Sequence, residues 1–192
     1  MRIIAGLYRG RILKTLPGRA LRPTSDRLRE TLFDVLGSTV EGSTFIDAYA
    51  GSGAVGLEAL SRGARRVSLI EENAAAFRII QANVAALGVG DNVDAVCAPV
   101  RKGLRLLDER GVRAAFCFLD PPYAALREYS ESLLWLSASR LMEPEGLIIV
   151  EHGRKDSLEQ RVGRWREVRI ITHGSSSLSF YRVEGEGAGN RE

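Results

Sequence analysis

Between residues 44 and 151, short apolar segments that predict strands alternate with longer segments that predict helices. Such alternation predicts a mostly parallel sheet with helices on both faces. Two further strand-like runs, 166–172 and 177–183, predict an antiparallel hairpin. The expected fold is therefore α/β and Rossmann-like, with a seven-stranded, mostly parallel sheet and an antiparallel C-terminal edge hairpin. The other strands are expected near 44–49, 66–71, 93–97, 115–119 and 146–151, and the helices near 54–62, 73–87, 100–110 and 127–141.

The chain is expected to divide into a basic extension, residues 1–37, a main domain, residues 38–184, and a flexible tail, residues 185–192. Within the extension, residues 2–16 predict a β-hairpin and residues 26–36 a helix.

Charge is distributed unevenly along the chain. Residues 1–30 carry eight Arg or Lys against two acidic residues, a net charge of +6, whereas the rest carries a net charge of −3. A basic arm on a mildly acidic body indicates a polyanionic partner. A solvated basic hairpin is the alternative. The basic residues are Arg2, Arg9, Arg11, Lys14, Arg19, Arg22, Arg27 and Arg29.

The composition indicates one globular domain. The chain has 192 residues, of which 45% are hydrophobic and 27% charged. Cys97 and Cys117 fall in predicted strands and are expected to be buried free thiols. His152 and His173 have no Cys or His at metal-ligand spacing, so no metal is expected. No apolar run is long enough to span a membrane and the first residues do not read as a signal peptide, so a cytoplasmic protein without membrane contact is expected. Nothing in the sequence demands more than a monomer.

Asp120-Pro121-Pro122-Tyr123 follows an apolar run, where open α/β sheets place their ligands. The Asp120 carboxylate and the carbonyls of Asp120 and Pro121 can accept hydrogen bonds from an exocyclic amine, and the prolines hold that backbone rigid. The Tyr123 ring can stack on a planar base. These four residues are candidate catalytic residues for chemistry on a base amine. An ordinary Pro-Pro turn is the alternative.

Residues 50–56 form a loop of small residues between a predicted strand and a predicted helix. Glycines let the backbone approach a ligand closely, and a helix N-terminus offers free N–H groups. Glu71 ends the next strand, where an acid can accept from ribose hydroxyls. The candidate cofactor-binding residues here are Asp47, Tyr49, Ala50, Gly51, Ser52, Gly53, Gly56 and Glu71.

Gly51-x-Gly53-x-x-Gly56 also matches the dinucleotide fingerprint, so NAD is a rival ligand. Asp47, at the end of the preceding strand, would repel a pyrophosphate but suits a cation, and the loop has no Arg or Lys to neutralise phosphates. S-adenosylmethionine (SAM), which carries a sulfonium and an ammonium, fits better. A tight strand–helix turn without a ligand remains an alternative.

The glycine loop and the Asp-Pro-Pro-Tyr element together resemble class I SAM-dependent methyltransferases that modify an exocyclic amine. The N-terminal blocks are similar to the bacterial 16S rRNA guanine-N2 methyltransferases of the RsmD family. This resemblance implies methyl transfer from SAM to the N2 amine of a guanine, in 16S rRNA or in the assembling small ribosomal subunit. It is carried by residues 2–6, 9–11, 21–33, 47–64 and 120–123.

The resemblance also implies roles for residues outside the two motifs. Thr24 and Arg27 are expected over the carboxylate end of SAM, with a charge pair at the helix end as the alternative for Arg27. Asp47 is expected to meet the ammonium of SAM, and Glu71 the ribose. The candidate RNA-binding residues are Arg2, Arg9, Arg11 and Arg22.

One departure concerns the adenine of SAM. Where the family commonly has Asp or Asn, this chain has Ala98-Pro99, so a backbone carbonyl or Asp94 must accept from the adenine amine, or the contact is absent. The rival functions are adenine-N6 methyl transfer with the same chemistry, an RNA-binding module without catalysis, and an NAD oxidoreductase.

Overall fold

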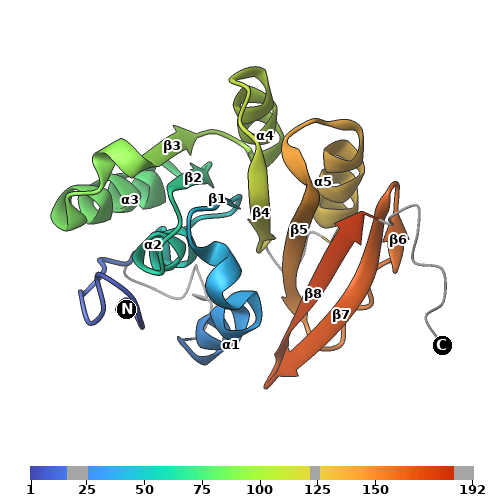
Figure 1. Ribbon diagram of the computed structural model, residues 1–192, viewed down its shortest axis with the longest axis horizontal. Coiled ribbons are helices and arrows are strands. Elements are labelled where there is room, and N and C mark those ends of the chain that lie inside the picture. Colours follow the sequence, from blue (N-terminus) through green and yellow to red (C-terminus); the bar gives the residue numbers. More distant parts are fainter. Residues whose placement is uncertain (17–25, 122–125, 184–192) are drawn as a thin grey trace.

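The computed structural model describes residues 1–16, 26–121 and 126–183, which contain one eight-stranded sheet and five α-helices (Figure 1). The sheet order is β3-β2-β1-β4-β5-β8-β7-β6, in which β1 to β5 run parallel and β6 to β8 antiparallel. The α/β architecture with an antiparallel C-terminal edge is therefore confirmed. The strands are β1 (Thr44–Asp47), β2 (Arg66–Glu71), β3 (Val93–Cys97), β4 (Ala114–Leu119), β5 (Met142–Gly153), β6 (Arg161–Val162), β7 (Trp165–His173) and β8 (Ser176–Val183).

The prediction of seven strands was wrong by one. The additional strand, β6, has two residues and pairs Val162 with Trp165 of β7. A segment this short carries no period-2 pattern for a sequence analysis to detect. The helices are α1 (Asp26–Leu36), α2 (Ala54–Ser61), α3 (Ala74–Leu87), α4 (Val100–Glu109) and α5 (Leu126–Ala138), with short 3₁₀ helices at Gly37–Val40 and Gly90–Asn92.

The junction between α5 and β5 differs from the prediction. The helix ends at Ala138 rather than near residue 141, and the strand begins at Met142 rather than near residue 146. Pairing with β4 explains the early start, because Met142 lies opposite Ala114, and Ala114 N–H donates to the Leu141 carbonyl at 2.8 Å.

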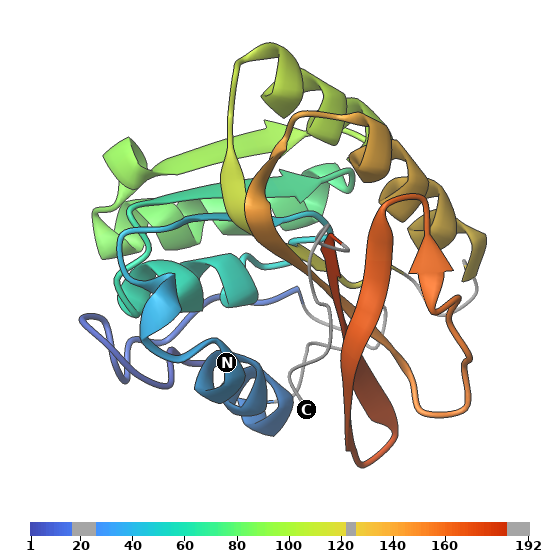
Figure 2. The same ribbon diagram turned by 45° about the vertical axis from the view of Figure 1, so that its right-hand side comes forward.

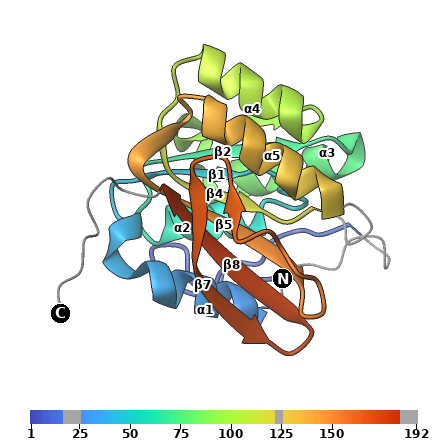
Figure 3. The same cartoon turned by 90° about the vertical axis from the view of Figure 1, so that its right-hand side faces the viewer.

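The sheet separates two hydrophobic cores. Figures 2 and 3 show α1 and α2 on one side of the sheet and α4 and α5 on the other. Successive strand residues alternate between the two sides, so Phe45 packs in the core that α1, α2 and α3 cover, and Ile46 in the core under α4 and α5. This alternation also decides which side chains share a face at the end of each strand.

The two cysteines differ in exposure. Cys117 lies in β4, in the middle of the sheet, and is buried as predicted. Cys97 ends β3, the edge strand, and is exposed, so the prediction that it is buried was wrong.

The N-terminal arm, residues 1–16, has less regular pairing than the predicted hairpin. Its β-bridge joins Arg2 to Ile12, and Ile3 N–H donates to the Arg11 carbonyl at 3.0 Å. Ile3 and Leu13 are buried in the same core as α2. The arm therefore packs on the body of the protein through its own apolar side chains.

Buried polar side chains fix the arm in place. The Glu58 carboxylate, on α2, accepts from Ile4 N–H at 2.8 Å and from Ala5 N–H at 3.0 Å. The same carboxylate faces Arg29 Nε at 3.7 Å, and Arg29 Nη2 donates to the Arg2 carbonyl at 2.6 Å. Arg29 and Glu58 are both fully buried. Arg29, counted above among the bases of a polyanion-binding arm, is thus a structural residue.

Candidate active site

The loop of residues 48–53 joins β1 to α2 through tight turns of the backbone, and it lies beside the carboxyl end of β2. Gly51 and Gly53 have positive φ angles of 55° and 81°, and Gly53 is the N-cap of α2. A Cβ at Gly51 would meet nothing within 4 Å, so this glycine borders open space. The open side of the loop at Gly51 is where a ligand can approach the backbone.

Gly56 has a packing role that the sequence did not predict. An added Cβ would lie 2.3 Å from Leu69 Cδ2 and 2.8 Å from Val67 Cγ1, both on β2. Gly56 therefore lets α2 pack closely on the sheet. Its part in the approach of a ligand to the loop stays a prediction.

Asp47, the last residue of β1, is buried against this loop. Its Oδ2 accepts from Gly56 N–H at 3.0 Å, and its Oδ1 is buried without a hydrogen-bond partner among the described residues. Burial raises the pKa of Asp47 to about 7; the Gly56 N–H opposes this rise and the charge of Glu71 adds to it. A buried carboxylate oxygen without a donor is suited to a cationic or hydrogen-bonding ligand.

Glu71, at the end of β2, holds the other side of the loop. Its Oε2 accepts from Gly51 N–H at 2.8 Å and its Oε1 from Asn73 N–H at 2.7 Å. Burial raises the pKa of Glu71, and these two N–H groups oppose the rise. Each carboxylate oxygen keeps a second lone pair, so Glu71 can still accept from ribose hydroxyls while it fixes the loop.

The remaining loop residues have distinct environments. Ala50 is buried, and its N–H donates to the Ile70 carbonyl at 2.9 Å. The Tyr49 hydroxyl donates to Glu128 of α5 at 3.1 Å, so this side chain turns away from the glycine loop towards the α5 side of the sheet. The Ser52 carbonyl accepts from Asn83, as described below.

Asn83 of α3 joins the loop to the N-terminal arm, which the sequence did not predict. Its side chain is buried; Nδ2 donates to the carbonyls of Ser52 and Lys14, each at 3.0 Å, and Oδ1 accepts from Lys14 N–H at 2.8 Å. The arm therefore runs past the glycine loop.

Asp120 follows β4 directly and is partly exposed, and Pro121 is buried. Burial, and then the charges of Glu151 and Asp47, raise the pKa of Asp120 well above its usual range. Asp120 therefore lies close enough to Asp47, beside the glycine loop, for their charges to interact. Pro122 and Tyr123 lie outside the described residues.

Glu151, on β5, was missed by the sequence analysis. It is buried, and its charge raises the pKa of Asp120 more than the charge of Asp47 does. The available signal was an acid directly after the apolar run 147–150, the pattern that Glu71 also shows after Ile70.

The four acids form a row along one edge of the sheet. They belong to four neighbouring strands or strand ends in the order β2, β1, β4 and β5. Strand register places their side chains on one face, because Asp47 pairs with Leu69 and Phe118, and Phe118 with Ile149. Glu71, Asp120 and Glu151 each lie two residues after one of these partners. The acid row, Glu71, Asp47, Asp120 and Glu151, spans the glycine loop and the Asp-Pro element.

Asp94, one candidate acceptor for the adenine amine, is paired with a base. It accepts from Arg110 Nη1 through both oxygens, at 3.0 and 2.9 Å. Each oxygen keeps a second lone pair, so the Asp94 side chain and a backbone carbonyl at residues 98–99 both stay predicted acceptors.

Two of the proposed contacts with the SAM carboxylate end are in or beside α1. Thr24 lies outside the described residues. Arg27 is exposed, and the Asp26 carboxylate pairs with Arg29 at 3.1 Å. This leaves the role of Arg27 as a prediction.

The candidate RNA-binding arginines are not equivalent. Arg2 and Arg9 are exposed, and Arg22 lies outside the described residues. Arg11 is exposed, but its Nη2 donates to the Ala86 carbonyl of α3 at 2.7 Å. Arg9 is thus more available to a phosphate than Arg11.

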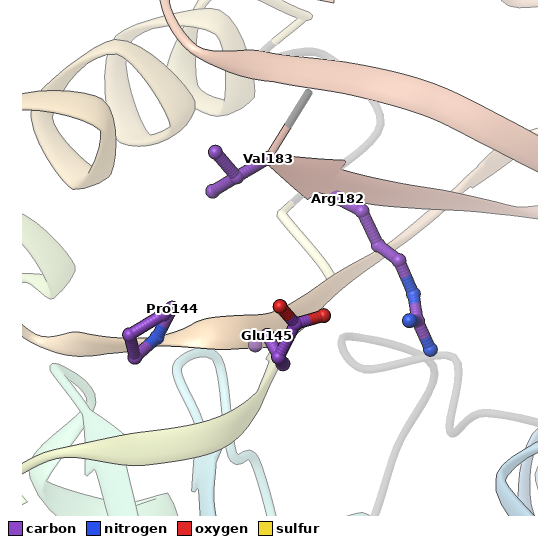
Figure 4. Close-up of a pocket in the computed structure, with 5 residues that line it drawn as sticks. Pro144, Glu145, Arg182 and Val183 are labelled. Atoms are coloured by element: carbon purple, nitrogen blue, oxygen red, sulfur yellow. The ribbon is translucent and has the colours of Figure 1, made fainter. Parts of the chain in front are cut away.

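The described residues were predicted to hold no metal and no membrane span. Within residues 1–16, 26–121 and 126–183, no group of three His, Cys, Asp or Glu side chains is placed to hold a metal ion. No helix in the same part of the chain is long and apolar enough to cross a membrane. A small pocket lined by Pro144, Glu145, Gly146, Arg182 and Val183 lies at the opposite end of β5 from the acid row (Figure 4).

This sheet order, with a glycine loop after β1 and an antiparallel β8 inserted beside β5, is the class I methyltransferase fold. The chain resembles an RNA methyltransferase from Salinibacter ruber solved with S-adenosyl-L-homocysteine, with a TM-score of 0.64 over 88% of this chain and 99% of that one; at 14% identity this likeness concerns the fold alone. The match to a hypothetical protein of Thermus thermophilus is nearer, with a TM-score of 0.80 and 33% identity over 95% of this chain and 99% of that one.

Sequence comparison places the chain in a particular family. The family model "Conserved hypothetical protein 95" matches residues 1–182, and the chain belongs to this family. The chain is also 35% identical to the ribosomal RNA small subunit methyltransferase D of Escherichia coli K12, over 97% of this chain and 92% of that protein. The resemblance deduced from the motifs is confirmed.

Proposed function

We propose that this protein transfers a methyl group from SAM to the exocyclic N2 amine of a guanine in 16S rRNA. The observation that carries the proposal is the acid row, which brings Asp120 beside Asp47 on neighbouring strands. A methyl donor bound at the glycine loop would then lie next to an amine held at Asp120. Membership of a family that includes an rRNA small subunit methyltransferase supports the RNA substrate, and an rRNA substrate supports a cytoplasmic location.

The residues present fit a cationic donor. Asp47 Oδ1 is buried without a partner in the described chain, and the neighbouring charges that act on Asp47 and Asp120 are carboxylates. Asp47 would accept from the donor's ammonium, directly or through water, and Glu71 from its ribose. When bound, SAM supplies a methyl carbon made electrophilic by its sulfonium. A pyrophosphate ligand would meet this row with charge repulsion, which argues against NAD.

Asp120 would act on the acceptor base. Its carboxylate, with the Asp120 and Pro121 carbonyls, would accept from both N2 hydrogens and direct the nitrogen lone pair at the methyl carbon. The new N–C bond forms as the S–C bond breaks, and the excess proton on nitrogen leaves to solvent. Holding the reacting atoms in line can contribute about 7–11 kcal/mol in well-aligned systems. A guanine inside a helix is out of reach, so the target would be in a loop or flipped out.

Methylation of 16S rRNA and of small-subunit particles with labelled SAM, followed by nucleoside mass spectrometry, tests the proposal. We expect N2-methylguanosine. The Asp120→Ala variant should bind SAM like the parent protein and lose turnover. N6-methyladenosine as the product would instead establish adenine-N6 chemistry, and full turnover by Asp120→Ala would refute the role of this carboxylate.

A further inference from the structure

Glu151 extends the acid row beyond the residues that methyl transfer itself requires. Leu119 of β4 pairs with Val150 of β5, so Asp120 and Glu151 are the next residues along two adjacent parallel strands. Side chains at matching positions of neighbouring strands point to the same face, and such strands lie about 4.8 Å apart. Glu151 is 5% exposed, so its side chain is buried, and its charge acts on the neighbouring Asp120.

Two neighbouring carboxylates can accept from the two neighbouring donors on one edge of guanine. Guanine presents the N2 amine next to the N1–H, two donors side by side. Adenine presents its N6 amine next to N1, which is an acceptor without a hydrogen. A carboxylate accepts and does not donate, so a second carboxylate beside the one that holds the amine favours guanine and disfavours adenine.

We propose that Glu151 is a specificity-determining residue that accepts the N1–H of the target guanine while Asp120 accepts from its N2 amine. This inference rests on the proposed function. The Asp-Pro-Pro-Tyr element alone does not select a base, because Asp120 can accept hydrogen bonds from the exocyclic amine of any base. Glu151 would supply the selection for guanine. Repulsion from Glu151 contributes to the raised pKa of Asp120, which agrees with the closeness that this arrangement needs.

A base analogue separates recognition of the N1–H from recognition of the N2 amine. 2-Aminopurine keeps the N2 amine but has an unprotonated N1, so Asp120 can hold its amine while Glu151 meets a lone pair. A 16S rRNA fragment carrying guanine or 2-aminopurine at the mapped target position would be methylated by the parent protein and by Glu151→Gln. The amide introduced by this substitution can donate to an unprotonated N1. We expect the guanine to 2-aminopurine rate ratio to fall about 10-fold or more in this variant, in line with the strength of a charged hydrogen bond.

Glu145→Gln is the matched control. Glu145 is an exposed acid of the same strand, six residues before Glu151 and beside the pocket of Figure 4. Its substitution removes the same charge from β5 and should leave the rate ratio unchanged. Comparing ratios within each variant cancels the effect of the missing O6 of 2-aminopurine.

If Glu151→Gln leaves the guanine to 2-aminopurine rate ratio unchanged, whether or not both rates fall, the inference is overturned. Glu151 would then have a purely structural role. If Glu151→Gln fails to fold, Glu151→Asp decides the matter. It keeps the charge and withdraws it by one methylene, so it should slow guanine methylation more than 2-aminopurine methylation; equal slowing would reject the inference. Absence of guanine methylation by the parent protein would be a failure of the proposed function instead.

Discussion

Gly56 N–H donates to Asp47 Oδ2 at 3.0 Å, which joins the first turn of α2 to the last residue of β1. The same glycine leaves no space for a side chain between α2 and β2. One residue thus sets the distance between helix and sheet and fixes one of the two oxygens of a buried carboxylate. The free oxygen of Asp47 is then held in place for a ligand.

Replacing Gly56 with Ala should destabilise the protein. The new methyl group would overlap Leu69 and Val67, and overpacking of this kind costs about 1–3 kcal/mol. The free energy of unfolding in urea measures the loss. Gly90→Ala is the control, because a Cβ there meets nothing within 4 Å and its φ is not positive, so it should stay close to the parent value. Equal stability of the two variants would contradict the packing role of Gly56.

Asp47 should couple SAM binding to a proton near neutral pH. Its pKa of about 7 in the free protein falls when a bound ammonium favours the charged form, so SAM affinity should rise with pH and binding at pH 6 should release a proton. Calorimetry in two buffers with different ionisation enthalpies measures this release. Asp47→Asn should bind more weakly and release no proton from this position; an identical proton count in both proteins would separate Asp47 from the ligand.

The same residue should affect the stability of the ligand-free protein. A carboxyl whose pKa is raised on folding contributes stability that is complete below its unfolded pKa and is lost as pH rises through the folded value. Between pH 4 and about pH 7, this group should cost at most about 4 kcal/mol of unfolding free energy. Asp47→Asn should lack this part of the decline. Urea unfolding at a series of pH values would show the difference, and parallel profiles would exclude it.

Turnover should depend on the ionisation of Asp120. Its raised pKa means that the accepting carboxylate is protonated at a higher pH than an ordinary Asp, so the rate should fall early as pH is lowered. Asp120→Asn keeps an acceptor oxygen that does not titrate and should retain part of the rate with a flatter acid limb. Single-turnover rates against pH measure this. An acid limb of the same shape in both proteins would assign the titration to another group.

Arg9 and Arg11 should contribute differently to RNA binding. Arg9→Glu removes a free guanidinium and should weaken binding and reduce the slope of log affinity against log salt by about one or more. Arg11→Glu should have a smaller effect, because Arg11 already donates to the Ala86 carbonyl. Arg113, an exposed base outside the arm that pairs with Asp108, provides the control for nonspecific charge. Equal slopes for the parent and Arg9→Glu would exclude phosphate contact at Arg9.

Local patterns predicted the fold well. The alternation of apolar runs is enough to predict β1 to β5, because β1, β2, β4 and the second half of β5 are almost entirely buried and the edge strand β3 is half-buried. The glycines of the loop locate the start of α2 through their backbone requirements. The pattern also placed Asp47, Glu71 and Asp120 at strand ends. Which of them face one another depends on strand order and register, which a single sequence does not contain.

The parts that the sequence missed depend on contacts between distant residues. Glu58 and Arg29 look like ordinary surface charges of two helices, yet they are buried against each other. Asn83 lies in the middle of α3 and its bonds to Lys14 and Ser52 span 69 and 31 residues. Glu151 was overlooked because it belongs to neither the glycine loop nor the Asp-Pro-Pro-Tyr element. In each case the partner, rather than the residue type, determines the role.

The anchoring of the arm has a consequence for how the chain acquires its structure during synthesis. Backbone groups of Ile4 and Ala5 bind the side chain of Glu58, and Lys14 binds that of Asn83. These two anchoring side chains are translated more than fifty residues after the backbone groups that they bind. Until α2 and α3 have been made, the arm lacks both anchors and is more open to proteases and to any nearby polyanion, including the nascent chain's own messenger and ribosome.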